Sequence, residues 1–147
     1  MSATIQLGPY RGVSNAMTTE LNAIAATTGK AISSAIDNSA TLDLFDDLEL
    51  AVDFVTAPTA GTVVELYLLP SIDGSVYPDG SASILPQSGL FVGGFAVRNT
   101  TAAQIMVLRG VALPPGLFKY VVQNTTNQAF PATGSVLRRN PYQLQSI

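Results

Sequence analysis

Half of the ten carboxylates in this 147-residue chain fall within one short segment, and they are the side chains with the clearest potential for chemistry. On an extended strand four of them share one side, where their oxygens could converge on Ca²⁺. The same alternation is typical of a solvated outer face, which we favour, or of a surface that meets basic groups of a partner. The segment comprises Asp43, Asp46, Asp47, Glu49 and Asp53, and the sequence does not decide whether it binds a cation.

The loop 70–80 is a second candidate site because it contains two Asp-Gly pairs, which supply the positive φ that tight turns need. It lacks the spaced ligand series and closing Glu of an EF-hand. We therefore favour a structural turn. Tyr77 in this loop and Tyr67 before it are candidate platforms for stacking on a sugar, since binding commonly lies in loops at one end of a sandwich.

The chain contains few side chains of the kinds that act as nucleophile or general base in enzymes. Histidine and cysteine are absent, and neither Lys30 nor Lys119 stands in a nucleophile motif. Paired carboxylates of the glycosidase kind remain an alternative, but the acidic segment looks like a surface strand and the chain has no Trp. We expect no enzyme, and we assign no catalytic, cofactor-binding or metal-binding residue.

Composition limits the partners. With a net charge of −3 and seven scattered Lys and Arg residues, the chain has no basic surface for nucleic acid. No apolar run approaches the ~20 residues of a membrane-spanning helix. The start has no secretory signal, so we expect synthesis in the cytoplasm of whatever cell produces the chain. Only 12% of the residues are charged, which indicates either a surface that lies against other protein or an ordinary Thr- and Ser-rich one.

Residues 1–30 differ from residues 31–147. The first segment is rich in Ala, Thr, Ser and Asn, and Thr18 precedes a spacing of Leu21 and Ile24 that predicts a short helix ended by Gly29. We interpret this segment as an N-terminal arm that contacts another subunit. The alternative is that it folds back on its own domain as an edge strand and a helical turn.

From residue 31 the apolar residues alternate in short runs separated by Gly, Pro and Asn. This pattern predicts an all-β, antiparallel β-sandwich, jelly-roll-like as first choice and immunoglobulin-like as second. Leu42, Leu44, Leu48, Leu50, Val52 and Phe54 are expected to face inward on one strand, with a bulge near Asp46 and Asp47. The pair Gly93-Gly94 indicates a bulge or a close backbone approach. Leu50 and Leu66 are the predicted centre of the core.

Strand and turn motifs spread over most of the chain resemble a group of small tailed-bacteriophage virion structural proteins. The motifs are AIDNS at 35–39, VELYLLP at 64–70, LPPGLFKY at 113–120 and QAFPA at 128–132. The resemblance is of the capsid decoration or cement type. It implies a protein at the capsid surface of the virion that binds the major capsid protein, or another virion protein, as a homotrimer. It supplies no binding residues.

The resemblance makes capsid decoration the first functional hypothesis, with the N-terminal arm supplying the contacts. A tail, baseplate or head-fibre component is the second. A carbohydrate-binding module used in host adsorption is the third, with Tyr67 and Tyr77 as platforms.

Overall fold

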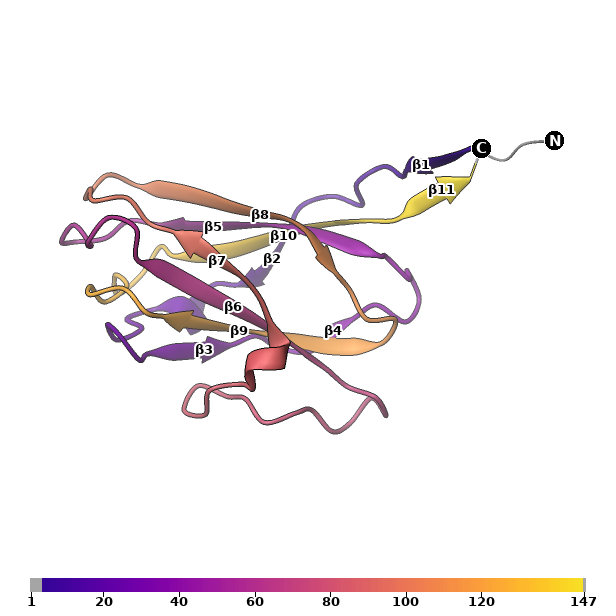
Figure 1. Cartoon of the computed structure of the whole chain (residues 1–147), viewed down its shortest axis with the longest axis horizontal. Helices are drawn as coiled ribbons and strands as arrows, with labels where there is room; N and C mark the ends of the chain where they lie inside the picture. Colours follow the sequence, from indigo (N-terminus) through magenta and orange to yellow (C-terminus); the bar gives the residue numbers. More distant parts are fainter. Residues whose placement is uncertain (1–3, 147) are drawn as a thin grey trace.

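The computed structural model describes residues 4–146 and consists of two antiparallel sheets packed face to face (Figure 1). The first sheet has the strand order β2 (Ser14–Met17), β10 (Val136–Tyr142), β5 (Phe45–Val52) and β8 (Gln104–Ala112). The second has the order β3 (Lys30–Ile32), β9 (Leu117–Asn124), β6 (Val63–Pro70) and β7 (Phe91–Ala96), with β4 (Ile36–Asp37) also paired to β9. The predicted all-β, jelly-roll-like sandwich is confirmed.

The core lies between the sheets and is built from the alternating rows that the sequence predicts. Leu50 of β5 and Leu66 of β6 are both fully buried, as expected. Phe118, Tyr120 and Val122 of β9, which lies beside β6 in the second sheet, belong to the same buried cluster. No helix in residues 4–146 is long and apolar enough to cross a membrane.

Residues 14–24 pack into this core, which agrees with the alternative of a segment folded back on its own domain. Met17, Leu21 and Ile24 belong to the same buried cluster as Leu50. The expected helix is reduced to one 3-10 turn, η1 (Thr19–Leu21). The backbone beyond it bonds to a distant segment instead, with Ala23 N–H donating to Pro131 O and Phe130 N–H to Ile24 O. The division into residues 1–30 and 31–147 stays a prediction.

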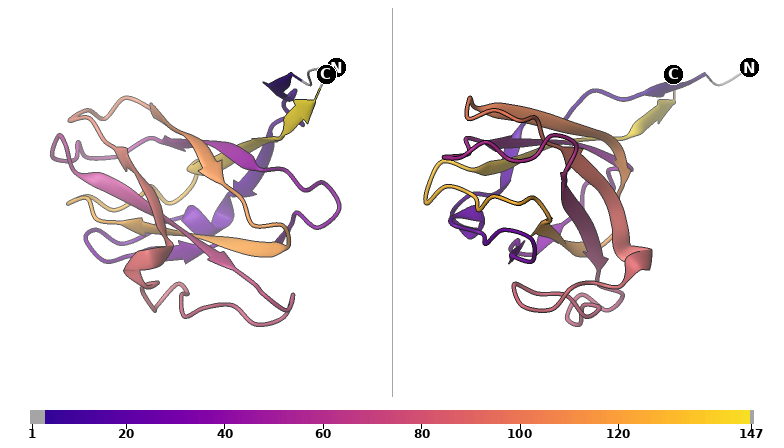
Figure 2. Two further views of the ribbon diagram at one scale, coloured as in Figure 1. Left: turned by 45° about the vertical axis from the view of Figure 1, so that its right-hand side comes forward. Right: turned by 60° about the vertical axis from the view of Figure 1, so that its left-hand side comes forward.

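A two-stranded ribbon lies outside the sandwich. β1 (Ile5–Leu7) pairs with β11 (Leu144–Ser146), and the two strands form a ribbon that projects from the body (Figures 1 and 2).

Both predicted irregularities in the strands are present. The register between β5 and β8 shifts opposite Asp47, where Arg109 and Gly110 face a single residue and Gly110 has a φ of 68°. At the other position, a Cβ added to Gly93 would lie 2.9 Å from Leu108 Cδ1 of the first sheet. The glycine therefore marks a close approach between the two sheets.

The outer faces of the two sheets differ in how they are covered. The long connection 71–87, followed by η2 (Ser88–Leu90), lies over the second sheet, where it buries Tyr67, Leu69 and Val121. Gly80 passes so close that a Cβ there would lie 2.6 Å from Leu69 Cδ2. The outer face of the first sheet is more open, and Ile105 and Val107 of β8 are 64% and 54% exposed there.

Truncating the core leucines tests this register. Leu50→Ala and Leu66→Ala should each lower the free energy of unfolding by about 2–5 kcal/mol, because a cavity replaces buried side-chain atoms. Ile72→Ala, in an exposed loop, should change it by about 0.5 kcal/mol or less. Denaturant titration measures all three, and core variants as stable as the loop variant would show that the register is wrong.

Candidate functional site

Alternation along β5 and β10 sends neighbouring charged residues to opposite sides of the first sheet. On β5, Asp46 faces the core, whereas Asp47 and Glu49 face outward. On β10, Arg139 turns inward to Asp46 and Arg138 turns outward to Glu49. Because successive side chains of a strand point to opposite faces of the sheet, each pair of adjacent charged residues places one side chain on the inner face and one on the outer face.

The inward group is a buried ion pair that joins the two sheets. Arg139 Nε donates to Asp46 Oδ2 at 2.7 Å, and the hydroxyl of Tyr120, on β9 of the second sheet, donates to the same oxygen at 3.0 Å. Burial raises the pKa of the Asp46 carboxyl, and the positive charge of Arg139 opposes that rise. The pKa of Tyr120 is also raised, chiefly by burial.

The outward group at Asp47 holds an N-terminal tyrosine over the sheet. Tyr10 Oη donates to Asp47 Oδ2 at 2.6 Å, Arg109 Nε donates to the same oxygen at 3.0 Å, and Gly110 N–H donates to Oδ1 at 2.8 Å. Partial burial by itself would raise the pKa of Asp47, but these hydrogen bonds outweigh it and the pKa is lowered. The carboxylate is therefore held in its ionised form.

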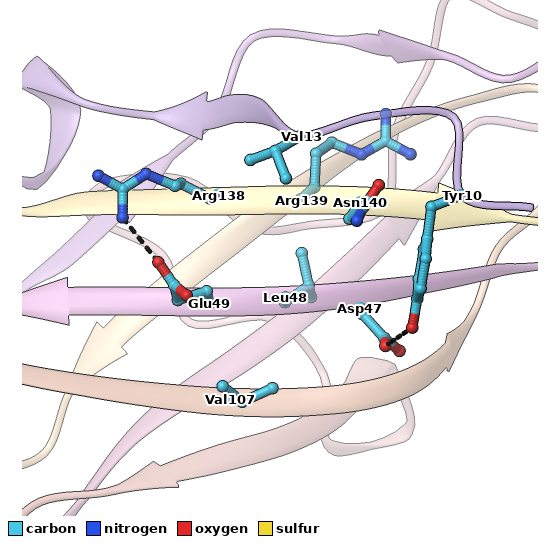
Figure 3. Close-up of a pocket in the computed structure, with 9 residues that line it drawn as sticks. All are labelled: Tyr10, Val13, Asp47, Leu48, Glu49, Val107, Arg138, Arg139 and Asn140. Carbon is cyan, nitrogen blue, oxygen red and sulfur yellow. Dashed lines mark hydrogen bonds and ion pairs between the residues drawn. The ribbon is translucent and has the colours of Figure 1, made fainter.

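Between these groups the outer face contains a hollow of about 390 Å³, which we call the sheet groove. Figure 3 shows Tyr10 at one end of it and the ion pair of Arg138 with Glu49, at 2.6 Å, at the other. Val13 and Val107, which are 66% and 54% exposed, supply apolar surface. The lining residues are Tyr10, Val13, Asp47, Leu48, Glu49, Val107, Arg138, Arg139 and Asn140.

Tyr10 belongs to an aromatic cluster at its end of the groove. Its ring lies edge-on to Tyr142, with the centroids 5.3 Å apart, and Tyr142 stacks on Phe45 at 5.5 Å. The Tyr10 side chain is nonetheless 47% exposed, so part of the ring is free to contact a ligand. Sequence reasoning missed this residue because Tyr10 and Asp47 are 37 positions apart and no local pattern joins them.

The acidic segment forms ion pairs with arginines rather than one continuous acidic face. Asp46, Asp47 and Glu49 pair with Arg139, Arg109 and Arg138, and Asp43 pairs with Arg11 at 2.9 Å. Asp53 is exposed. Within residues 4–146, no group of three or more His, Cys, Asp or Glu side chains is arranged to hold a metal ion.

The strand begins later than the sequence suggests, which corrects the expected faces at its start. Leu42 and Leu44 are exposed and Asp43 is buried, because β5 starts at Phe45 and the preceding residues form a turn. Asn38 fixes that turn: its Oδ1 accepts Asp43 N–H at 2.9 Å, and its Nδ2 donates to Asp43 O at 2.8 Å.

The two tyrosines predicted as sugar platforms are poorly placed for that role. Tyr67 is only 6% exposed, and its hydroxyl donates to Glu65 at 2.7 Å. Burial, and then this contact, raise the pKa of Tyr67 to about 12. Tyr77 is half-buried, and the ammonium group of Lys119 lies 4.3 Å from its ring centroid. Asp73, in the same loop, caps the turn by accepting from the N–H groups of Ser75 and Val76.

Comparison with known proteins gives similarity in structure only. No protein family model and no curated protein matches the chain. A family 36 carbohydrate-binding domain of a multidomain xylanase from the hindgut metagenome of Trinervitermes trinervoides has a TM-score of 0.45 and 13% identity, over 99% of this chain and 97% of that one.

Two further solved structures are similar to the same degree. A family 36 carbohydrate-binding module in complex with calcium and xylotriose has a TM-score of 0.46 and 10% identity, over 100% of both chains. A family 6 module from Clostridium cellulolyticum in complex with xylose has a TM-score of 0.43 and 12% identity, over 97% of this chain and 96% of that one. Scores and identities this low do not assign a function to this chain.

These matches correct the resemblance drawn from the sequence. They are carbohydrate-binding modules rather than phage virion proteins and give the predicted capsid-decoration family and function no support, so we withdraw both. The expected partnership with a major capsid protein and the homotrimer are withdrawn with them. A location at a capsid surface is not tested by any of these observations and stays a prediction.

The adjacent arginines of β10 allow a matched test of the two faces. Arg139→Ala should lower the free energy of unfolding by about 3–5 kcal/mol, because it leaves the buried Asp46 carboxylate without its cation. Arg138→Ala, which breaks a more exposed pair, should cost about 1 kcal/mol or less. Equal costs in thermal or denaturant unfolding would contradict the placement of the two residues.

The lowered pKa of Asp47 makes part of the stability depend on pH. A carboxylate with a folded-state pKa below its ordinary value of 3.8 adds stability above that value and loses it as the pH falls through the folded pKa. The wild type should therefore lose more unfolding free energy than Asp47→Asn between about pH 5 and about pH 2. Asp53→Asn, at an exposed position, is the control and should follow the wild type; parallel curves for all three would refute the assignment.

Proposed function

We propose that this chain is a non-catalytic carbohydrate-binding module whose sheet groove holds a neutral sugar. One observation carries the proposal: a half-exposed tyrosine ring adjoins four hydrogen-bonding side chains in one open hollow. The four are Asp47, Glu49, Arg138 and Asn140.

The combination matches the two kinds of surface that a sugar presents. A pyranose has an apolar face of C–H groups that packs on an aromatic ring, and Tyr10 offers such a ring at one end of the groove. Its hydroxyls both donate and accept hydrogen bonds. The carboxylates of Asp47 and Glu49 accept, the guanidinium of Arg138 donates, and the amide of Asn140 does both.

The charges in the groove favour a neutral ligand over an acidic one. Asp47 and Glu49 are each neutralised by an arginine at 3.0 Å or less. A carboxylate-bearing sugar would have to separate one of these pairs, whereas a hydroxyl can bridge its two partners without breaking it.

The same pairs support a binding role over a catalytic one. A carboxylate acting as nucleophile or general base has to reach the reacting atom. The Asp47 carboxylate is already engaged by Tyr10, Arg109 and the Gly110 N–H group, and the chain contains no His or Cys to take its place.

Binding to neutral polysaccharides tests the proposal. The purified chain should be retarded in affinity electrophoresis through gels that contain xylan, soluble cellulose derivatives or mannan, and should bind a neutral oligosaccharide of the retarding type in calorimetry. Tyr10→Ala should weaken that binding by about tenfold or more, by analogy with nucleobases, whose stacking on an aromatic side chain contributes about 1–3 kcal/mol. Tyr10→Phe, which keeps the ring, should retain most of the affinity.

Tyr77→Ala is the matched control, because it removes a tyrosine outside the groove and should leave affinity unchanged. A loss at Tyr77 but not at Tyr10 would move the site to the loop 71–87. Failure to bind any neutral polysaccharide or oligosaccharide would overturn the proposed function.

A further inference from the structure

A second hollow of about 390 Å³ lies beside the sheet groove at the β2 edge of the first sheet, and we call it the edge cleft. It is formed by β2, the turn η1 and the connection that leads into β10. Its lining residues are Asn15, Thr18, Thr19, Asn22, Thr133, Gly134, Ser135, Val136 and Arg138.

The two hollows meet at Arg138, which lines both. In the register of the sheet, Arg138 lies between Asn15 of β2 and Glu49 of β5, and Glu49 lies beside Val107 of β8. These four residues therefore form one row across the first sheet. With a strand spacing of about 4.8 Å, the row is about 14 Å long, which exceeds a single sugar ring.

Ser135, one of the residues that line the edge cleft, has a buried hydroxyl that the protein does not satisfy. Ser135 is 3% exposed, and its Oγ has no hydrogen-bond partner among the described residues. A buried polar atom without a partner costs free energy, and this cost is recovered if ligand binding brings a hydrogen-bond partner to it. This observation is independent of the shape of the cleft and also indicates a polar ligand.

The rest of the lining consists mainly of uncharged polar groups. Within the described part of the chain, the side chains of Asn15, Asn22 and Thr133 make no hydrogen bonds to other protein groups. Arg138 is the single charged residue in the lining, and it is already paired with Glu49. Amides and hydroxyls without internal partners suit a neutral, hydroxyl-rich ligand.

We infer that the edge cleft is a second subsite and that the ligand is an extended oligosaccharide crossing the strands from β8 to β2. One unit occupies the sheet groove beside Tyr10, and later units continue past Arg138 toward Ser135. This inference rests on the proposed function, since it assigns the length and course of the ligand in the same site.

Chain-length dependence tests the inference. Affinities should be measured by calorimetry for a series of neutral, linear oligosaccharides from disaccharide to hexasaccharide, chosen from the polysaccharide that the wild type binds. The wild type should bind the longest about tenfold more tightly than the shortest, or better, which corresponds to about 1.4 kcal/mol or more. Asn22→Ala combined with Thr133→Ala should remove most of that gain and leave binding of the shortest member unchanged.

Ser135→Ala separates binding from folding. Removing a buried hydroxyl without a partner should leave the unfolding temperature unchanged or higher, and should still weaken binding of the long oligosaccharides. Thr101→Ala, an exposed threonine in the connection between β7 and β8, is the matched control and should match the wild type at every length.

The outcomes distinguish this inference from the proposed function. If the edge-cleft variants bind every length as the wild type does, while Tyr10→Ala still weakens binding, the second subsite is refuted and the sheet groove stands. If no oligosaccharide of any length binds the wild type, both fail together.

Discussion

The buried ion pair of Asp46 with Arg139 is the interaction on which the rest of the structure depends. An aspartate fully shielded from water is costly unless its charge is met, and here Arg139 and Tyr120 both donate to one of its oxygens. Because Arg139 comes from the neighbouring strand and Tyr120 from the opposite sheet, the three groups fix β10 against β5 and the two sheets against each other. Arg139 also lies 5.6 Å from the Phe118 ring centroid, which extends the same contact along β9.

The register set by that pair determines the chemistry of the outer face. Once Asp46 and Arg139 face the core, the period of two requires that Asp47 and Arg138 face outward. The bulge at Arg109 and Gly110 then turns a backbone N–H group and a guanidinium toward Asp47, and the carboxylate in turn holds the hydroxyl of Tyr10. The groove is thus assembled from three strands and an N-terminal segment, none of which has a binding motif of its own.

Local patterns in the sequence were enough to predict the long strands, most of their inward rows and both irregularities, since these depend on the alternation of neighbours and on glycine. The inward row failed at Leu42 and Leu44, which precede β5 and are exposed. The site depends on pairings between residues far apart, and such pairings leave no local trace. Arg138 and Arg139 look alike in the sequence, yet one lies on each face. Asp46 could be recognised as an interruption in the row of apolar residues along β5, but its ion-pair partner, Arg139, is 93 residues away. The helix expected after Thr18 failed for a similar reason, because backbone bonds to residues 130 and 131 replaced the helical ones.

The ribbon of β1 and β11 has a mechanical consequence. Its two strands are antiparallel, and the pair nearest the chain ends, Ile5 with Ser146, lies at the tip. A pulling force applied between the two ends would load this pair first and then each following pair in turn, so the ribbon would open like a zipper instead of resisting in shear. The same order continues into the body, where β2 is antiparallel to β10 and leaves it from Ser14 toward Met17. Tension would therefore separate β2 from β10 and break the hydrogen bond of Tyr10 to Asp47 before it reached the buried ion pair of Asp46 with Arg139.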